Sequence, residues 1–305
     1  MEALYPPGAT VMYHGGKMEF KCLKYEVADK VLTLTLNVPE KLNAVNAAFC
    51  KELLEAFDAA DRDDDVGAVI VTGAGRAFCA GADLSDDSNE GIFVSKGAHK
   101  DDKAPHRDEG GLVCLRIYDM KKPVIAAING AAVGFGCTMT LPMDIRIAST
   151  KAKMGIVFAR RGIVFDGASA WFLPRMVGMS TAAEWVYSGR IFSSQEALER
   201  RLVSELLEPD QLLPRALQIA REIVDNSSSI SVALCRQLMW KMLGADHPFE
   251  AHVLESRTLN WIYGTGDSLE GIKSFLEKRP PAFPMKVSRD MPGFYPWWKE
   301  REFKY

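Results

Sequence analysis

The two stretches that decide the fold are Gly75-Arg-Ala-Phe-Cys-Ala-Gly-Ala-Asp-Leu84 and Asn129-Gly-Ala-Ala-Val-Gly-Phe-Gly-Cys137. Each follows an apolar run and places small residues at a tight bend. Glycine and alanine let a backbone turn sharply and approach a ligand closely. N–H groups from both bends can therefore point at one oxygen atom, which suits a developing enolate. We expect the two bends to form the halves of one oxyanion hole.

Strands and helices are predicted to alternate around these bends. Residues 31–38 alternate apolar residues with Thr, the period of a half-buried strand, and helical spacing follows over residues 46–60. Short apolar strands are predicted at 66–72 and 124–128, ahead of the two bends. The second bend leads into a helix whose first free N–H groups would face the same place.

The last third of the chain is predicted to be mainly helical. Ser193 and Glu196 match a capping box that opens a helix over residues 197–202. Apolar residues at helical spacing predict three further helices, over residues 212–224, 230–243 and 267–278.

Composition and charge narrow the class of protein. The chain has 305 residues, of which 48% are apolar and 25% charged, enough for one large domain or a main domain with a helical appendage. A net charge of -3 and a pI near 6.0, with scattered Lys and Arg, offer no basic surface for nucleic acid. No apolar run is long enough to cross a bilayer and no targeting signal is evident. We expect a cytoplasmic protein that binds neither nucleic acid nor membrane.

Cysteine and histidine spacing does not predict a metal site. The sequence has no Cys-x-x-Cys and no His-x-x-x-His pair, so we expect no bound metal. In a chain with ample material for a core, the six cysteines are predicted to be buried free thiols in a reducing compartment. They are Cys22, Cys50, Cys79, Cys114, Cys137 and Cys235.

Residues 85–111 form a polar stretch rich in Asp, Ser, Asn, Lys and His. Such a stretch is either a surface loop or, because it follows the first bend directly, a lid over the site. Both interpretations stay open.

Five motifs, in this order, resemble those of the crotonase superfamily, the enoyl-CoA hydratase and isomerase proteins, over roughly residues 20–282. They are Pro39-Glu-Lys-Leu-Asn-Ala44, Phe78-Cys-Ala-Gly-Ala-Asp-Leu84, Pro123-Val-Ile-Ala-Ala-Ile-Asn-Gly130, Asp144-Ile-Arg-Ile-Ala148 and Glu270-Gly-Ile-Lys-Ser-Phe-Leu-Glu-Lys-Arg-Pro280. The resemblance implies an α/β spiral of ββα repeats with a C-terminal helical trimerisation region. It also implies a homotrimer or homohexamer that acts on acyl-CoA thioesters, with coenzyme A as part of the substrate and no separate cofactor.

The resemblance also implies domains and site residues. It divides the chain into an N-terminal extension (1–20), a spiral core (21–205) and a C-terminal helical region with a tail (206–305). The backbone N–H groups of Ala82 and Phe135 take the positions of the oxyanion-hole donors. Positions that contact coenzyme A or the acyl group hold Lys41, Leu42, Ala80, Asp83, Leu84, Gly134, Phe158, Phe275 and Lys278. Ordinary packing is the alternative for these residues, and a solvated surface charge is the alternative for the two lysines.

The catalytic acids depart from the hydratase pattern. Hydratases of this superfamily use two glutamates, and their positions hold Thr138 and Phe158 here. Neither side chain can act as a carboxylate acid or base, so two-glutamate addition of water is not expected. Asp166 matches the position where isomerases and several other branches carry a single working carboxylate, and it is our catalytic candidate. A helix N-cap or a turn residue before Gly167 is the alternative role.

Three functions therefore stay open. The first is an enoyl-CoA isomerase or hydratase-like enzyme in which Asp166 moves a proton at an enolate that the backbone donors stabilise. The second is a ring-forming, ring-opening or dehalogenating enzyme that uses the same aspartate as nucleophile or proton donor. The third is a non-catalytic acyl-CoA-binding protein, suggested by the two missing glutamates. Arg160 and Arg161 are expected at a helix edge against a neighbouring subunit rather than in the cleft.

Overall fold

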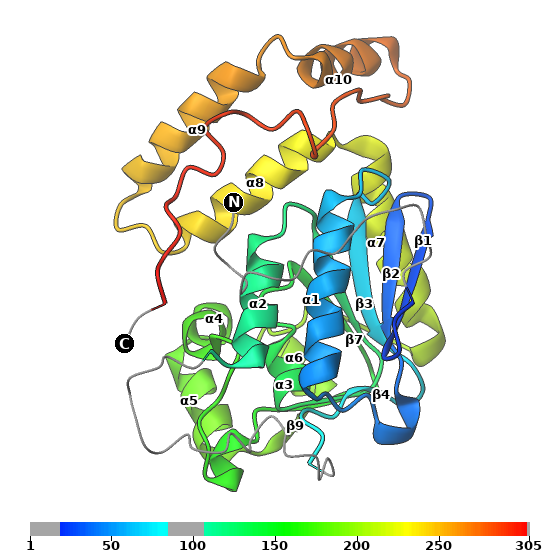
Figure 1. Cartoon of the computed structure of the whole chain (residues 1–305), viewed down its shortest axis with the longest axis vertical. Helices are drawn as coiled ribbons and strands as arrows, with labels where there is room; N and C mark the ends of the chain where they lie inside the picture. The colour runs from blue at the N-terminus through cyan, green and yellow to red at the C-terminus, as the bar shows by residue number, and fades with distance from the viewer. Residues whose placement is uncertain (1–18, 85–106, 304–305) are drawn as a thin grey trace.

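A six-stranded sheet forms the centre of the fold in the computed structural model, which describes residues 19–84 and 107–303 (Figure 1). Its strand order is β1-β2-β3-β5-β7-β10. The first two strands pair antiparallel and all other neighbours pair parallel. The strands are β1 (Leu23–Ala28), β2 (Val31–Leu36), β3 (Ala68–Gly73), β5 (Val124–Ile128), β7 (Ile145–Ser149) and β10 (Glu205–Leu207).

A second sheet of four strands has the order β4-β6-β8-β9. Its members are β4 (Ala77–Cys79), β6 (Ala131–Val133), β8 (Lys153–Gly155) and β9 (Ile191–Ser193). Along the chain β4 follows β3, β6 follows β5 and β8 follows β7, and a helix comes after each pair. One strand of each pair lies in each sheet. This repetition agrees with the predicted ββα spiral.

Helices cover both faces of the large sheet, which explains why β3 and β5 are continuous apolar runs. One face packs with α1 (Ala47–Arg62) and α2 (Glu109–Asp119) in the main core. The opposite face packs against the apolar side of α7 (Pro209–Asn226). Asn46 caps α1, its side chain accepting a hydrogen bond from the Phe49 N–H at 3.0 Å. This is the helix predicted over residues 46–60.

Shorter helices surround the second sheet. As the capping box predicts, the Ser193 side chain accepts a hydrogen bond from the Glu196 N–H at 3.1 Å. The helices are α3 (Phe135–Thr138), α4 (Ser169–Val177), α5 (Met179–Ser188) and α6 (Ser194–Glu199), with 3-10 turns at Pro39–Lys41 and Phe158–Arg161.

Asn43 ties the segment before α1 to the strand that leads into the first bend. Its side chain is fully buried. The amide oxygen accepts from the Val38 N–H at 2.9 Å, and the amide nitrogen donates to the carbonyls of Ala77 at 2.9 Å and Phe78 at 3.1 Å. Asn43 also has a φ of +56°, a left-handed conformation that asparagine tolerates better than most residues. The Pro39–Ala44 motif therefore has a structural role.

We expect the Asn43→Ala substitution to lower the free energy of unfolding by about 2–4 kcal/mol, because it leaves several buried backbone groups unpaired. Urea unfolding at a fixed protein concentration measures this change. Asn226→Ala is the matched control, since Asn226 is exposed at the end of α7. Equal effects of the two substitutions would show that the Asn43 hydrogen bonds do not stabilise the fold.

Asp144 joins the C-terminal helices to the core. Its carboxylate accepts from the Val124 N–H at 2.7 Å, from Arg236 Nε at 2.8 Å and from Trp240 Nε1 at 2.7 Å. Two of these donors lie on α8 (Ser229–Met242), so α8 is fixed against the end of β5. The motif that begins at Asp144 is thus explained by packing.

The C-terminal helices α9 (Pro248–Ile262) and α10 (Gly266–Glu277) lie beyond α8, at the end of the molecule away from α3 (Figure 1). The helices predicted over residues 212–224, 230–243 and 267–278 are confirmed as α7, α8 and α10. Several large apolar side chains on α9 and α10 are exposed in the single chain: Phe249, Val253, Leu259, Leu269, Ile272, Phe275 and Leu276. The division at residues 20 and 205 and the trimerisation role stay predictions.

The prediction that all six cysteines are buried differs from the structure. Cys50, Cys79, Cys114 and Cys137 are buried free thiols, but Cys235 is exposed and Cys22 is half-buried. Cys235 lies on the solvent face of α8, beside the buried Leu234, so helix orientation and not residue type decides its exposure. Most of the 85–111 stretch, including its possible lid, lies outside the described residues, and α2 already begins at Glu109.

None of the helices in the described ranges has both the length and the apolarity required to span a membrane. The cytoplasmic location stays a prediction.

Candidate active site

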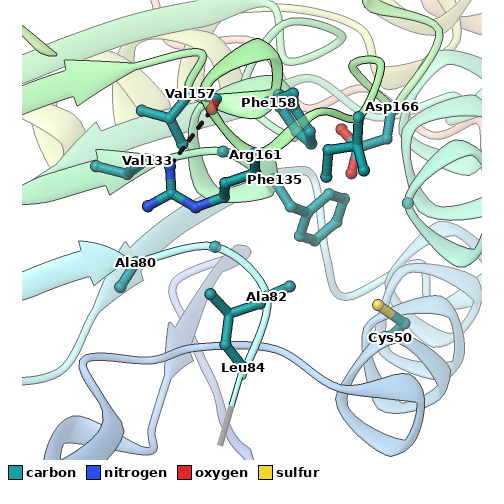
Figure 2. Close-up of a pocket in the computed structure, with 14 residues that line it drawn as sticks. Cys50, Ala80, Ala82, Leu84, Val133, Phe135, Val157, Phe158, Arg161 and Asp166 are labelled. Carbon is teal, nitrogen blue, oxygen red and sulfur yellow. Dashed lines mark hydrogen bonds between the residues drawn. The ribbon is translucent and has the colours of Figure 1, made fainter. Parts of the chain in front are cut away.

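One pocket lies where the two bends meet (Figure 2). Both bends, the start of α2, one residue of α1 and the loop after β8 contribute to its wall. Its lining residues are Cys50, Ala80, Gly81, Ala82, Leu84, Gly110, Val133, Gly134, Phe135, Val157, Phe158, Arg161, Ile163 and Asp166.

Gly81 brings the two bends into direct contact. Its φ is +98°, and a Cβ built on it would lie 2.7 Å from the carbonyl oxygen of Val133. Any side chain at this position would force the first bend away from the second, and the backbone angle also favours glycine. The glycine in the first motif is therefore required by this close approach.

The N–H group of Ala82 points away from the segment around Val45, with which Ala82 pairs. Val45 N donates to the Gly81 carbonyl and Asp83 N donates to the Val45 carbonyl, both at 2.8 Å, so Val45 forms a parallel bridge with Ala82. In such a bridge the residue between the two bonded ones, here Ala82, directs its N–H away from the partner segment. Ala82 lines the pocket, and within residues 19–84 and 107–303 no acceptor is paired with its N–H.

Phe135 is the first residue of α3, and Gly134 precedes it with φ +56° and ψ -126°. The first N–H groups of a helix have no partner inside the helix. Gly134 O accepts from the N–H groups of Cys137 and Thr138, whereas no acceptor in the described part of the chain is paired with the Phe135 N–H. The structure thus brings both predicted donors to one pocket, each with an N–H that is available to a ligand.

Asp166 carries the only carboxylate among the pocket-lining residues of the described ranges. Its Oδ1 accepts a hydrogen bond from the Thr138 hydroxyl at 2.6 Å. Figure 2 shows the carboxylate beside the rings of Phe135 and Phe158. The predicted acid–base residue and the predicted donor Phe135 therefore share one wall of the pocket.

Burial raises the pKa of Asp166 to about 6, the Thr138 hydrogen bond opposes this rise, and the negative charge of Asp108 adds to it. Desolvation disfavours the charged form of a carboxyl group, while a donor that stabilises the carboxylate works in the opposite direction. A pKa near 6 leaves the group mostly ionised at pH 7 and still able to accept and return a proton.

The side chain of Asp166 does not cap a helix, which was the alternative role for this residue. The residue that caps α4 is Ala168, and no side-chain hydrogen bond caps that helix. Only the backbone carbonyl of Asp166 serves the turn, accepting from the Ser169 N–H at 3.1 Å and from the Ser169 hydroxyl at 2.6 Å. The carboxylate instead accepts a hydrogen bond from Thr138 and faces the pocket.

The start of α2 packs tightly against Asp166, a contact that is not evident from the sequence. A Cβ built on Gly110 would lie 2.9 Å from Asp166 Oδ2 and 3.1 Å from the Phe135 ring. Asp108 caps the helix by accepting from the Gly111 N–H at 2.5 Å. Two adjacent glycines in the first turn of a helix were the available signal, because glycine in a helix commonly has a packing reason.

The residues predicted to contact coenzyme A or the acyl group divide into three sets. Ala80, Leu84, Gly134 and Phe158 line the pocket. The second set lies at or beside the first bend but does not line the pocket. Its members are Lys41, Leu42 and Asp83.

Lys41 pairs with Asp83, with Nζ 2.6 Å from Oδ2 and the lysine side chain 49% exposed. The Leu42 carbonyl accepts from the Ala80 N–H at 3.0 Å. These contacts position the first bend, and a ligand role for the three residues stays a prediction.

Phe275 and Lys278 form the third set. Phe275 is 81% exposed on α10, and Lys278 ends that helix. Neither residue lines the pocket, and Figure 1 places α10 far from α3. They are not part of this pocket, and their contact with coenzyme A stays a prediction.

Arg161 lines the pocket, contrary to the expectation that it lies at a helix edge outside the cleft. It lies on the side of Val133 and Ala80, and its Nη1 donates to the Val157 carbonyl at 3.4 Å (Figure 2). Arg160 points elsewhere and donates to the Ser188 carbonyl at 2.8 Å. Consecutive residues of a 3-10 turn point in different directions, and the sequence alone does not reveal which of the two arginines faces the pocket.

The described residues contain no group of three or more His, Cys, Asp or Glu side chains placed to hold a metal ion. The absence of a metal and of a separate cofactor stays a prediction.

The chain is similar to known proteins over most of its length. The enoyl-CoA hydratase/isomerase family model matches residues 26–286. The enoyl-CoA hydratase ACTT3 of Alternaria alternata is 42% identical over 257 residues, which is 84% of this chain and 83% of that protein. The 1,2-epoxyphenylacetyl-CoA isomerase of Escherichia coli is 32% identical over 279 residues, covering 87% of this chain and 98% of that protein.

A solved structure supports the same assignment. A probable enoyl-CoA hydratase/isomerase from Mycobacterium abscessus superposes with a TM-score of 0.77 at 32% identity, covering 87% of this chain and 99% of that one. The chain therefore belongs to the enoyl-CoA hydratase/isomerase family.

Proposed function

We propose that the protein is an enoyl-CoA isomerase that stabilises a thioester enolate and uses Asp166 as its single acid–base group. One observation carries this proposal: a carboxylate with a pKa near 6 shares a pocket with two backbone N–H groups that have no acceptor in the described residues. A base and an oxyanion hole are the two parts that enolate chemistry requires.

In this proposal the thioester oxygen accepts hydrogen bonds from Ala82 N–H and Phe135 N–H. Asp166 takes a proton from C2 of a 3-enoyl thioester, and the electron pair of that C–H bond moves through the carbonyl to the oxygen. The enolate then collapses, the pair moves back through C2 and C3, and Asp166 returns the proton to C4. The double bond thereby shifts into conjugation with the thioester.

Hydration by two glutamates is disfavoured by the side chains that replace them. Thr138 has no carboxylate, and its hydroxyl is occupied by Asp166. Phe158 places an apolar ring in the pocket and is 5% exposed. Any hydration at this site would have to be carried by Asp166 alone, so isomerisation is the better supported reaction.

A second candidate function is supported by the aromatic wall of the pocket. The rings of Phe135 and Phe158 lie beside Asp166, which suits a cyclic or aromatic acyl group (Figure 2). The Escherichia coli relative is named as an isomerase of an epoxyphenylacetyl thioester. A ring-forming, ring-opening or dehalogenating reaction would use the same carboxylate as nucleophile or proton donor.

A panel of thioesters tests these alternatives. We expect the protein to convert 3-enoyl thioesters to 2-enoyl thioesters, seen as a rise in ultraviolet absorbance without change of mass. A gain of one water would indicate hydration, and turnover confined to cyclic or aryl thioesters would support the second candidate. Binding of every thioester without turnover would identify a non-catalytic acyl-CoA-binding protein and refute the proposal.

The proposal predicts a pH dependence for kcat/KM. The base must be ionised, and its pKa is about 6, so kcat/KM should rise with pH through about 6 and level off above it. Steady-state rates between pH 5 and 9 measure this limb. A flat profile over that range, or a limb that falls with rising pH near 6, would contradict the role of Asp166 as a base.

We also propose that the protein works as a homotrimer or homohexamer. The apolar side chains on α9 and α10 are exposed in the single chain, and α10, which carries Phe275 and is followed by Lys278, lies far from α3 (Figure 1). The predicted contact of Phe275 and Lys278 with coenzyme A would then be made in a neighbouring subunit. Sedimentation equilibrium distinguishes a trimer or hexamer from a monomer, which would argue against this arrangement.

A further inference from the structure

We infer that Thr138 is a positioning residue that holds one oxygen of the Asp166 carboxylate and leaves the other oxygen to carry the proton. The inference rests on the proposed function, because it assigns separate roles to the two oxygens of the proposed base. It also gives a task to a residue that occupies the place of a missing glutamate.

The Thr138 hydroxyl is fixed in place by its surroundings. The residue is fully buried at the end of α3. Its N–H donates to the Gly134 carbonyl at 3.0 Å and its carbonyl accepts from the Leu141 N–H at 3.1 Å, so its backbone is held on both sides. Threonine in a helix has two favoured rotamers, because its hydroxyl can approach a carbonyl of the preceding turn. The Thr138 hydroxyl lies 3.4 Å from the Phe135 carbonyl, so its nearer acceptor is Asp166. The hydroxyl therefore reaches Asp166 Oδ1 at 2.6 Å from a rigid support.

The second oxygen of Asp166 has a different environment. In the described part of the chain no other residue donates a hydrogen bond to Oδ2. Oδ2 lies beside the Gly110 backbone, where an added Cβ would come within 2.9 Å of it, and that Cβ would also meet the Phe135 ring. Gly110 and Phe135 both line the pocket. Oδ2 is thus the oxygen that can exchange a proton with a substrate.

The Thr138 hydrogen bond is compatible with both states of the base. When Asp166 is ionised, the hydroxyl donates to the negatively charged Oδ1. When Oδ2 carries the proton, Oδ1 is a carbonyl oxygen and still accepts from the same hydroxyl. The carboxyl group therefore need not rotate between taking the proton and returning it. The bond is stronger to the ionised form, so it also lowers the pKa that burial raises.

Two substitutions separate this role from simple packing. Thr138→Val keeps the shape and removes the hydroxyl, whereas Thr138→Ser keeps the hydroxyl. We expect the valine variant to lose about 10- to 100-fold in kcat near pH 7 with little change in KM, because the base is no longer held in register. The pH at which kcat/KM of the valine variant rises to half its plateau should increase by about one unit. The serine variant should stay close to the wild type in both measurements.

A direct titration separates failure of this inference from failure of the proposed function. The carbon-13 resonance of the Asp166 carboxyl, assigned with Asp166→Asn, reports its pKa without turnover. An upward shift in the valine variant supports the inference even if the reaction proves to be different. An unchanged titration in the valine variant, or a serine variant that behaves like the valine variant, would overturn the inference and leave the proposed base in place.

Discussion

Asp166→Asn is expected to lower kcat for isomerisation by about 10²- to 10⁴-fold, the range that a positioned general acid–base residue contributes. Asparagine fills nearly the same space and can still accept a hydrogen bond from Thr138, but it cannot take a proton from carbon. No other carboxylate among the described residues lines the pocket to replace it. Steady-state rates with a 3-enoyl thioester measure the loss.

Folding stability provides the control for this substitution. The pKa of Asp166 is raised from 3.8 to about 6, so the folded protein binds the proton more tightly than the unfolded chain does. The resulting stabilisation is present at low pH and is lost as pH rises from about 4 to about 6. At pH 8, Asp166→Asn should therefore not lower the free energy of unfolding.

Asp225→Asn, at an exposed carboxylate on α7, should leave kcat unchanged. Loss of less than threefold in Asp166→Asn, or an equal loss in both variants, would argue against Asp166 as the base.

Phe135→Pro is expected to lower kcat by about 10²- to 10³-fold relative to Phe135→Ala, because only proline removes the backbone N–H. Both variants lose the phenyl ring, so their difference isolates the proposed oxyanion donor. Phe135 is the first residue of α3, a position where proline is tolerated since its N–H would have no helical partner. Rates and circular dichroism of the two variants make the comparison.

The comparison of proline with alanine requires that both variants fold, which circular dichroism checks. If Phe135→Pro and Phe135→Ala turn over a 3-enoyl thioester at the same rate, the Phe135 N–H does not stabilise the transition state. A rise in KM alone, with kcat unchanged, would assign the N–H to binding of the ground state.

Local features of the fold could be predicted because they depend on neighbouring residues. The strand predicted at 124–128 is β5 with the same bounds, since a short apolar run bounded by Pro123 and Asn129 has few alternatives. Ser193 is the N-cap that the capping box predicts, but the helix it opens spans Ser194–Glu199 and not residues 197–202. Helix α9 was not predicted individually, because its apolar residues lie on an exposed face and give no clear core-facing pattern.

Contacts between residues that are far apart in the chain could not be predicted from the sequence. The pairing of Thr138 with Asp166 joins residues that are 28 positions apart, and the sequence alone shows only that Thr138 lacks a carboxylate. The approach of Gly110 to Asp166 is likewise set by how α2 packs. Motif positions placed Asp166, Ala82 and Phe135 in one pocket, whereas their hydrogen-bond partners and the direction of Arg161 required the tertiary structure.

The measurement that tests the central claim most directly is deuterium exchange into a bound enoyl thioester in heavy water, with the wild type beside Asp166→Asn. We predict that the wild type incorporates deuterium at C2 or C4, detected by mass spectrometry, and that the variant binds the same thioester without incorporating it. Equal incorporation by both proteins would show that Asp166 does not move the proton. No incorporation by a wild type that demonstrably binds the thioester would show that the pocket does not form the enolate.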